Sequence, residues 1–335
     1  ADRDVEIRPD RTYLVTGGLG GIGLLAAERL AERGARHLVL VGRSDPGSAA
    51  REAIARMEKA GTAVRVRRAD VADEAALHQA LASALDEGPP LGGVIHSAGV
   101  LDDGVVTQLD WSRFASVLAP KVDGGWALHE ATRGQPLDFF VLYSSIASLF
   151  GSPGQANHAA ANAFLDALAH YRRSCGLPGV SLNWGAWLET GAAARTETAD
   201  RAAERGVLGL SPGEGLDALT RLLDPASAQV GVVKLAWASF LEHHPVGVPR
   251  AFFSSLPREG TIQATPRRVE ADLRARLSAA SPGSREALLR SHVRDAAVKV
   301  LGLGAAASLD PRRPLQEVGL DSLMAVELRN ALGAS

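Results

Sequence analysis

The stretch Thr16-Gly17-Gly18-Leu19-Gly20-Gly21-Ile22-Gly23 decides the fold of the N-terminal part of this chain. It follows a short β-rich run, 12–16, and it precedes residues 23–32, whose apolar positions have helical spacing. Glycines at a strand-to-helix turn let the backbone approach a pyrophosphate, and the following helix N-terminus offers unpaired N–H groups and a positive dipole end. This context favours a dinucleotide site over the alternative, a glycine turn without a ligand.

Strands and helices alternate along the chain that surrounds this turn. The expected strands after the first are 37–41, 63–67, 93–96, 139–144, 179–183 and 229–236, and the expected helices between them include 49–60, 75–85, 111–118, 124–131 and 159–173. Such alternation implies right-handed crossovers and a parallel sheet with helices on both faces. The expected fold class is therefore α/β, a doubly wound parallel sheet.

Composition and charge exclude several classes of protein. The 335 residues are 46% hydrophobic and 22% charged, as in ordinary globular proteins, and a net charge of −2 provides no basic field for nucleic acid. No apolar run approaches the roughly 20 residues that span a membrane. The single cysteine, Cys175, is typical of a reducing compartment. We expect a soluble cytoplasmic protein without nucleic-acid or membrane partners, and no metal site, since His243 and His244 lack a suitably spaced third ligand.

Residues after the second and third expected strands bear on the identity of the dinucleotide. Arg43 and Ser44 stand where NAD-binding proteins carry an acidic residue, and this pair suits a 2′-phosphate, so NADPH is the expected cofactor. Asp70 and Val71 could bracket the adenine. Asp70 could instead cap a helix.

Two later segments make the chain resemble a known family. The runs 141–145 and 154–166 (VLYSS and GQANHAAANAFLD) resemble the catalytic half of a ketoreductase domain from a modular type I polyketide synthase, a member of the short-chain dehydrogenase/reductase superfamily with its Rossmann fold. Further matches are His96-Ser97-Ala98-Gly99, Ala119-Pro120-Lys121-Val122 and Asn183-Trp184-Gly185. Gly319-Leu320-Asp321-Ser322-Leu323, with Glu327-Leu328-Arg329-Asn330, resembles the acyl carrier protein that follows such a reductase. The resemblance covers nearly the whole chain.

The resemblance implies that NADPH reduces a carrier-bound β-ketoacyl thioester to a β-hydroxyacyl thioester. Ser145 would bind the ketone oxygen, Lys121 would be the cation that tunes the proton donor, and Asn162 would relay protons. The family's catalytic tyrosine, four residues before Asn162, is here His158. The expected cofactor-binding residues are Thr16, Gly17, Gly18, Leu19, Gly20, Gly21, Ile22, Gly23, Arg43, Ser44, Asp70, Val71, Ser97, Ala98, Gly99 and Lys121.

His158 leaves two interpretations open. Histidine is a competent general acid near neutral pH, and even a neutral imidazole can polarise a carbonyl. Its ring is shorter than a phenol, however, and a misplacement of about an ångström can cost on the order of a hundredfold in rate. A nearby Lys121 would also lower the pKa of His158. The alternative to a working reductase is a silent structural or docking domain, in which His158 fills a cavity.

Stereochemical markers follow from the same resemblance. Leu101-Asp102-Asp103 matches the motif of B-type ketoreductases, Pro153 and Asn157 also fit, and Phe150 stands where A-type domains have tryptophan. The implied product is a D-configured 3-hydroxyacyl thioester. An exposed loop without a stereochemical role is the alternative for Asp102 and Asp103.

The expected domains are 1–256, the ketoreductase catalytic subdomain; 257–283, a linker; and 284–335, a partial acyl carrier protein that looks cut short at Ser335. Ser322, at an expected helix start, would carry 4′-phosphopantetheine in the intact parent, although a serine there could simply cap the helix. The expected partners are carrier-bound intermediates and neighbouring synthase domains in a homodimeric parent.

Overall fold

The structure is a computed structural model of the chain. It describes residues 5–86, 88–190, 206–242, 250–253, 273, 276–301, 310, 313–318, 320, 325, 328–329 and 332. Ser322 and most of the expected linker lie outside the described residues. None of the described helices is long and apolar enough to cross a membrane.

A seven-stranded parallel sheet forms the centre of the larger part of the chain, in the order β3-β2-β1-β4-β5-β6-β8. Its strands are β1 Thr12–Thr16, β2 His37–Gly42, β3 Ala63–Arg68, β4 Leu91–His96, β5 Phe139–Ser145, β6 Val180–Trp184 and β8 Gln229–Val232. Successive strands are added on one side of β1 as far as β3 and on its other side from β4 onward. The strand order therefore reverses between β1 and β4, which is the point at which ligands bind in doubly wound folds. The expected α/β fold class is confirmed.

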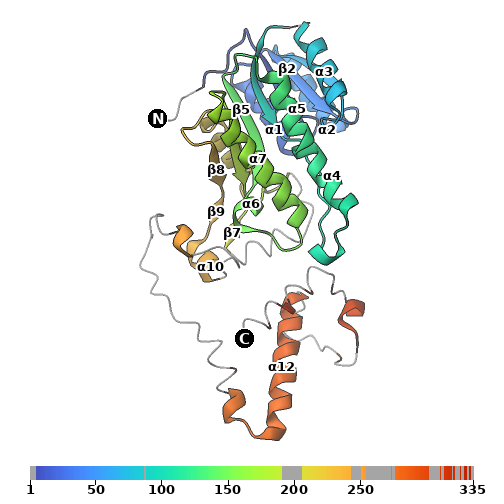
Figure 1. The fold of residues 1–335 in the computed structure, drawn as a ribbon, viewed down its shortest axis with the longest axis vertical. Helices are drawn as coiled ribbons and strands as arrows, with labels where there is room; N and C mark the ends of the chain where they lie inside the picture. Colours follow the sequence, from blue (N-terminus) through green and yellow to red (C-terminus); the bar gives the residue numbers. More distant parts are fainter. Residues whose placement is uncertain are drawn as a thin grey trace. The chain divides into compact units, whose positions relative to one another are not determined.

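Helices cover both faces of the sheet (Figure 1). They are α1 Gly21–Glu32, α2 Ser48–Lys59, α3 Glu74–Asp86, α4 Trp111–Lys121, α5 Asp123–Thr132, α6 Ala147–Phe150, α7 Ala156–Ser174, α9 Pro212–Arg221 and α10 Trp237–Glu242. Leu30 of α1 and Leu219 of α9 belong to the core on one face. Leu128 of α5 and Leu165 of α7 belong to the core on the other face. Alternate residues of β5 pack into the two cores, so Tyr143 and Leu142 lie on opposite faces of the sheet.

Two element boundaries differ from the sequence-based expectation. The expected strand 229–236 is divided, because β8 joins the main sheet whereas β9, Lys234–Leu235, pairs antiparallel with β7, Val207–Leu208. Helix α4 continues to Lys121 rather than ending at residue 118. Pro120 lies in its last turn and removes a hydrogen bond only from the carbonyl of Ser116, an exposed residue.

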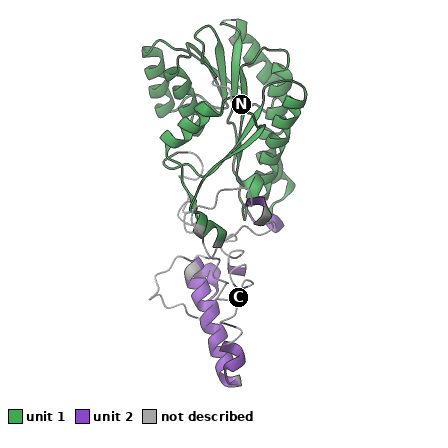
Figure 2. Ribbon diagram, turned by 90° about the vertical axis from the view of Figure 1, so that its left-hand side faces the viewer, with its two compact units in different colours: residues 1–103, 109–250 green, residues 104–108, 251–335 purple. Residues whose placement is uncertain are grey.

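The chain divides into two compact units, residues 1–103 with 109–250 and residues 104–108 with 251–335 (Figure 2). The second unit contains the helix α12, Pro282–Val300, and the short 3-10 helices η1 Val106–Gln108, η3 Arg250–Phe253 and η4 Leu315–Val318. Helix α12 covers the start of the helix expected from Ser284. The expected domain boundaries at 256 and 283 stay predictions.

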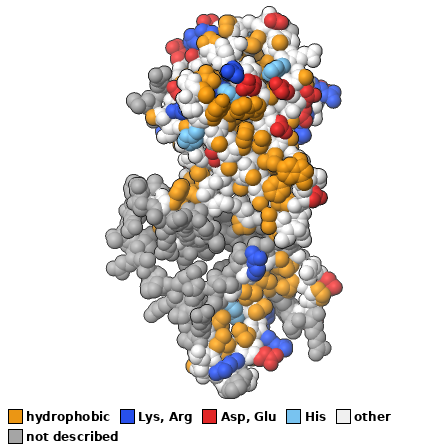
Figure 3. Space-filling model, viewed as in Figure 1, with side chains coloured by type: hydrophobic (Ala, Val, Ile, Leu, Met, Phe, Trp, Pro, Cys, Tyr) orange, Lys and Arg blue, Asp and Glu red, His pale blue; other side chains and the backbone are white. Residues whose placement is uncertain are grey.

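Aromatic side chains are exposed where α5 and α7 lie side by side. Hydrophobic side chains gather over α4, α5 and α7 on the face shown in Figure 3. Trp126 of α5 and Tyr171 of α7 are 43% and 48% exposed, and their ring centroids lie 5.8 Å apart. The surface over α5 and α7 thus includes exposed aromatic side chains.

Candidate active site

The turn between β1 and α1 lies against the loop that follows β4. Gly17 has φ +67°, and a Cβ there would lie 2.9 Å from the backbone nitrogen of Ala98. A Cβ on Gly23 would overlap the carbonyl oxygen of Gly17 and Oγ of Ser97. That Ser97 hydroxyl donates a hydrogen bond of 2.6 Å to the carbonyl of Thr16. Glycine is therefore required at both positions to bring the two loops together.

The outer side of this turn is open and rich in unpaired donors. Apart from the two neighbouring residues, no described atom lies within 4 Å of a Cβ placed on Gly20, and no described side chain caps the N-terminus of α1, which begins at Gly21. The first N–H groups of a helix have no partner within the helix, and together they attract anions. The turn thus has the shape and donor set that fit a dinucleotide pyrophosphate.

The residues expected near the adenosine end lie at the ends of β2 and β3. Arg43 and Ser44 are exposed, and Nε of Arg68 donates to the backbone carbonyl of Arg43 at 3.2 Å, so a second guanidinium lies at the end of β2. The sequence analysis did not single out Arg68. Oδ1 of Asp70 accepts from the backbone N–H of Ala72 at 3.0 Å and closes a turn, while Val71 is buried.

Lys121, the last residue of α4, is buried between the loop after β4 and strand β5. Its Nζ donates to the carbonyl of Tyr143 at 2.8 Å, and a Cβ on Gly99 would lie 3.6 Å from Nζ. Burial lowers the pKa of Lys121 to about 8, and the negative charge of Asp166 opposes that effect. The cation therefore lies between the cofactor loop and the strand that carries Ser145.

Hydrogen bonds connect His158 and Asn162 to each other and to strand β5, which ends at Ser145. Nδ2 of Asn162 donates to the carbonyl of His158 at 2.8 Å, one helical turn earlier on α7. Oγ of Ser144 donates to the carbonyl of Asn162 at 3.3 Å, which joins β5 to α7. The next residue, Ser145, accepts from the N–H of Ala147 at 3.1 Å through its Oγ. Lys121 thus ends α4, Ser145 ends β5, and His158 and Asn162 lie in the first two turns of α7, which packs against both elements.

His158 is neutral at physiological pH in this environment. Burial and then the positive charge of Lys121 lower the pKa of His158 to about 4. Among the described residues, its buried Nδ1 has no hydrogen-bond partner, and neither has Oδ1 of Asn162. A neutral imidazole carries one N–H donor and one acceptor nitrogen.

No other tyrosine takes the place of His158. The chain has three, Tyr13, Tyr143 and Tyr171. Tyr143 lies nearest in sequence to the site, but its ring packs on Trp184 at 5.4 Å, on the face of the sheet opposite to α7. Burial raises the pKa of its hydroxyl, which has no partner among the described residues.

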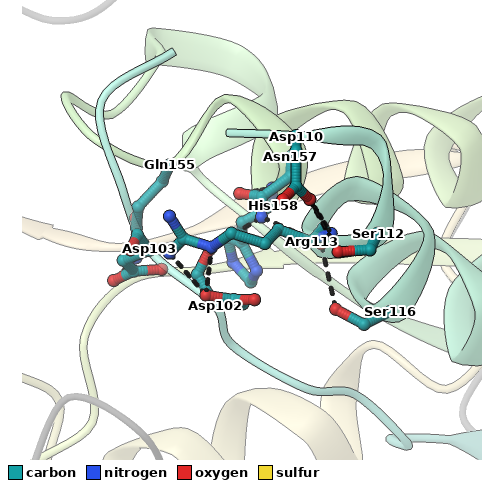
Figure 4. Close-up of polar contacts among 9 residues, drawn as sticks. All are labelled: Asp102, Asp103, Asp110, Ser112, Arg113, Ser116, Gln155, Asn157 and His158. Atoms are coloured by element: carbon teal, nitrogen blue, oxygen red, sulfur yellow. Dashed lines mark hydrogen bonds and ion pairs between the residues drawn. The ribbon is translucent and has the colours of Figure 1, made fainter. Parts of the chain in front are cut away.

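The loop with Leu101, Asp102 and Asp103 is fixed to α4 and α7 (Figure 4). Nε of Arg113 on α4 donates to Oδ1 of Asp102 at 2.8 Å, and Nη2 donates to the carbonyl of Asp103 at 2.6 Å. From α7, Nδ2 of Asn157 donates to the carbonyl of Asp102 at 2.8 Å. Oδ1 of Asn157 also accepts from the N–H of His158 at 2.8 Å. The loop is therefore connected directly to His158.

The other expected stereochemical residues are on the surface around this network. Leu101 is 40% exposed, and Pro153 lies in the exposed turn before α7. Gln155 joins the network because its Nε2 donates to Oδ2 of Asp103 at 2.9 Å. The sequence analysis did not single out Arg113 or Gln155, since neither belongs to the motif by which the loop was found.

A model of the KR domain family matches residues 11–189, which hold the glycine turn, Lys121, Ser145 and α7. The chain belongs to the ketoreductase domains of polyketide synthases. A second model, the phosphopantetheine attachment site, matches residues 291–334 of this ketoreductase chain.

Named relatives agree with this assignment. The ketoreductase chain is 44% identical to the spectinabilin polyketide synthase system protein NorB of Streptomyces orinoci, over 97% of this chain and 15% of that protein. It is 41% identical to the polyketide synthase GfsB of Streptomyces halstedii, over 98% of this chain and 6% of that protein. The chain thus spans a small part of these relatives.

Solved ketoreductases have the same fold. A structure of A-type ketoreductases from a modular polyketide synthase is 39% identical, with a TM-score of 0.69, over 74% of this chain and 53% of that one. A ketoreductase from the first module of phoslactomycin biosynthesis in Streptomyces sp. HK803 is 32% identical, with a TM-score of 0.69, over 75% and 60%.

Proposed function

We propose that this ketoreductase domain uses NADPH to reduce a carrier-bound β-ketoacyl thioester to a D-configured 3-hydroxyacyl thioester. The observation that supports this best is the packing of Lys121 between Gly99 of the cofactor loop and the carbonyl of Tyr143, two residues before Ser145. This contact supports the proposal because Gly99 is expected to bind the cofactor and Ser145 is expected to bind the ketone oxygen. When bound, NADPH would supply the hydride.

The residues of the chain would bind the substrate and provide the proton. The Ser145 hydroxyl and the N–H of neutral His158 would both donate to the ketone oxygen. As negative charge develops on that oxygen, the N–H proton of neutral His158 passes to it and leaves an imidazolate beside Lys121. The positive charge of Lys121 disfavours a second proton on the ring, and for the same reason it favours loss of the first. Neutral histidine thereby serves as the acid in place of a phenol.

The cofactor assignment depends on groups at the ends of β1, β2 and β3. The α1 N-terminus would bind the pyrophosphate, and Arg43 with Arg68 would bind the 2′-phosphate. Arg43→Ala should weaken NADPH binding and leave NADH binding unchanged. Equilibrium titration by cofactor fluorescence measures both, and equal losses for the two cofactors would contradict the assignment.

The reaction itself is tested with a β-ketoacyl N-acetylcysteamine thioester. We expect NADPH oxidation by the unaltered chain and a loss of about a hundredfold in kcat for Ser145→Ala, which removes one donor to the developing oxyanion. Ser112→Ala, on the exposed start of α4, is the matched control. If the chain binds NADPH and never oxidises it, the alternative holds, namely a silent structural or docking domain in which His158 does not reach the ketone.

We also infer that Ser322 carries 4′-phosphopantetheine in the parent synthase, because it lies within the match to the phosphopantetheine attachment site. A phosphopantetheinyl transferase with coenzyme A should modify the intact parent, and Ser322→Ala should remove that modification in a mass spectrum. Neighbouring synthase domains, a homodimeric parent and a cytoplasmic location stay predictions.

A further inference from the structure

Asp166 is a buried carboxylate that the proposed reaction does not use. It lies on α7, one turn after Asn162, and is 7% exposed. Its oxygens accept from Oγ of Ser148 at 2.6 Å and from Oγ of Ser181 at 2.5 Å. Nδ2 of Asn183 lies 3.0 Å from both of its oxygens. In the described part of the chain, no lysine or arginine forms an ion pair with it. A buried charge held only by neutral donors is costly, and it calls for an explanation.

The donors around Asp166 also hold the backbone of the expected catalytic strand. Oγ of Ser148 lies 2.9 Å from the carbonyl of Ser145. Nδ2 of Asn183 lies 3.3 Å from the same carbonyl and 3.1 Å from Oγ of Ser144. Three elements, α6, β6 and α7, therefore meet at one carboxylate directly behind Ser145. Loss of the carboxylate would release the donors that fix this part of β5.

Lys121 is the positive charge that faces the same region. On β4 it faces His96, whose pKa is lowered to about 3 by burial and then by Lys121 itself. On α7 it faces His158, which is also neutral. From β5 the carbonyl of Tyr143 accepts a hydrogen bond from its Nζ. Asp166 is the negative charge that acts on it, and this charge raises the pKa of Lys121 against the effect of burial.

We propose that Asp166 is a positioning residue, which orders Ser148, Ser181 and Asn183 behind Ser145 and is the counter-charge to buried Lys121. The proposal deepens the proposed function, on which it rests for the role of Lys121 in reduction. The coupling between the two charges is a property of the folded chain alone, so it is measured without NADPH and without substrate.

The decisive experiment is the titration of Lys121 by NMR. The chain has four lysines, Lys59, Lys121, Lys234 and Lys299, so the ¹³Cε signals are few, and Lys121→Met assigns the one in question. In Asp166→Asn, we expect the pKa of Lys121 to fall by about 1, because a nearby opposite charge is lost. In the control Ser181→Ala, which removes a donor and keeps the charge, it should not change. An unchanged Lys121 pKa in folded Asp166→Asn overturns the proposal.

A second variant keeps the test valid if Asp166→Asn does not fold. Asp166→Ala removes the charge without placing an amide beside the donors of Ser148, Ser181 and Asn183, and it should lower the pKa of Lys121 by a similar amount. An unchanged Lys121 pKa in this folded variant overturns the proposal in the same way.

Activity gives the third readout. In Asp166→Asn, the alkaline limb of kcat/KM should move to lower pH by about the same amount as the Lys121 pKa, whereas Ser181→Ala should lower the rate without moving the limb. A limb that stays in place despite a lower Lys121 pKa contradicts the positioning role. If no form of the chain reduces a ketone, the proposed function fails, while the NMR result still decides the coupling between the charges.

Discussion

His158 lies one turn before Asn162, where a phenol would reach further into the site than an imidazole. Its imidazole ring is neutral at physiological pH because burial and the charge of Lys121 lower the pKa of His158 to about 4. We expect His158→Tyr to raise kcat by about tenfold to a hundredfold, since the longer side chain restores the reach. His158→Phe, which fills the space without a donor, should be inactive. Both are measured with the thioester assay. A decrease in kcat for the tyrosine variant would show that the site is shaped around histidine.

A second consequence of buried histidine concerns stability. His96 is fully buried, and its folded-state pKa of about 3 lies below the ordinary 6.5, so the unfolded chain binds its proton first as the pH falls. The contribution of neutral His96 to the free energy of unfolding is therefore fully present above pH 6.5. Below that pH it decreases by about 1.4 kcal/mol per pH unit. Urea unfolding between pH 7 and pH 5 should show a shallower decrease for His96→Gln. Equal slopes in both proteins would mean that His96 is protonated in the folded state.

At the scale of elements, the contact between the β1–α1 turn and the loop after β4 leaves no space for a side chain at Gly23. Its Cβ would meet the carbonyl of Gly17, a backbone atom that cannot move aside. We expect Gly23→Ala to cost about 1–3 kcal/mol and to abolish NADPH binding. Gly47→Ala is the matched control, because Gly47 precedes α2 and no described atom beyond its chain neighbours lies within 4 Å of a Cβ there. Thermal unfolding and cofactor titration measure both, and full binding by Gly23→Ala would rule out the turn as the pyrophosphate site.

The ion pair between α4 and the loop of Asp102 and Asp103 predicts a stereochemical effect. Arg113 holds that loop, which Asn157 connects to His158. Arg113→Gln should lower kcat/KM by about tenfold and raise the share of the minor 3-hydroxyacyl enantiomer, because a loosened loop lets the substrate enter in more than one orientation. Chiral chromatography of the product measures this. Arg56→Gln, which breaks a surface ion pair with Glu28, is the control and should leave the enantiomer ratio unchanged.

The elements were largely predictable from the sequence, because alternating apolar strands and amphipathic helices are local patterns. The side-chain network around Asp166 was not, since its donors Ser148, Ser181 and Asn183 come from α6 and β6, and only the folded sheet brings them to α7. The same holds for Arg113, which stands outside the Leu101-Asp102-Asp103 motif and contacts it across a turn. The glycine turn was recognisable because its glycines are adjacent in sequence.

For the whole molecule, the division into two units suggests which part of the chain is needed for the ketoreductase fold. Among the described residues, the buried members of the three core clusters lie between Ile7 and Leu223, and β8 pairs with β6 at the edge of the sheet. Deletion of residues 257–335 should therefore leave NADPH affinity unchanged and the thermal midpoint within about 2 °C. A chain that ends at residue 228 loses β8 and exposes the edge of β6, so it should unfold at a much lower temperature or fail to fold. If deletion of residues 257–335 already destabilises the protein, the first unit depends on the C-terminal residues, and the boundary expected at 256 is wrong.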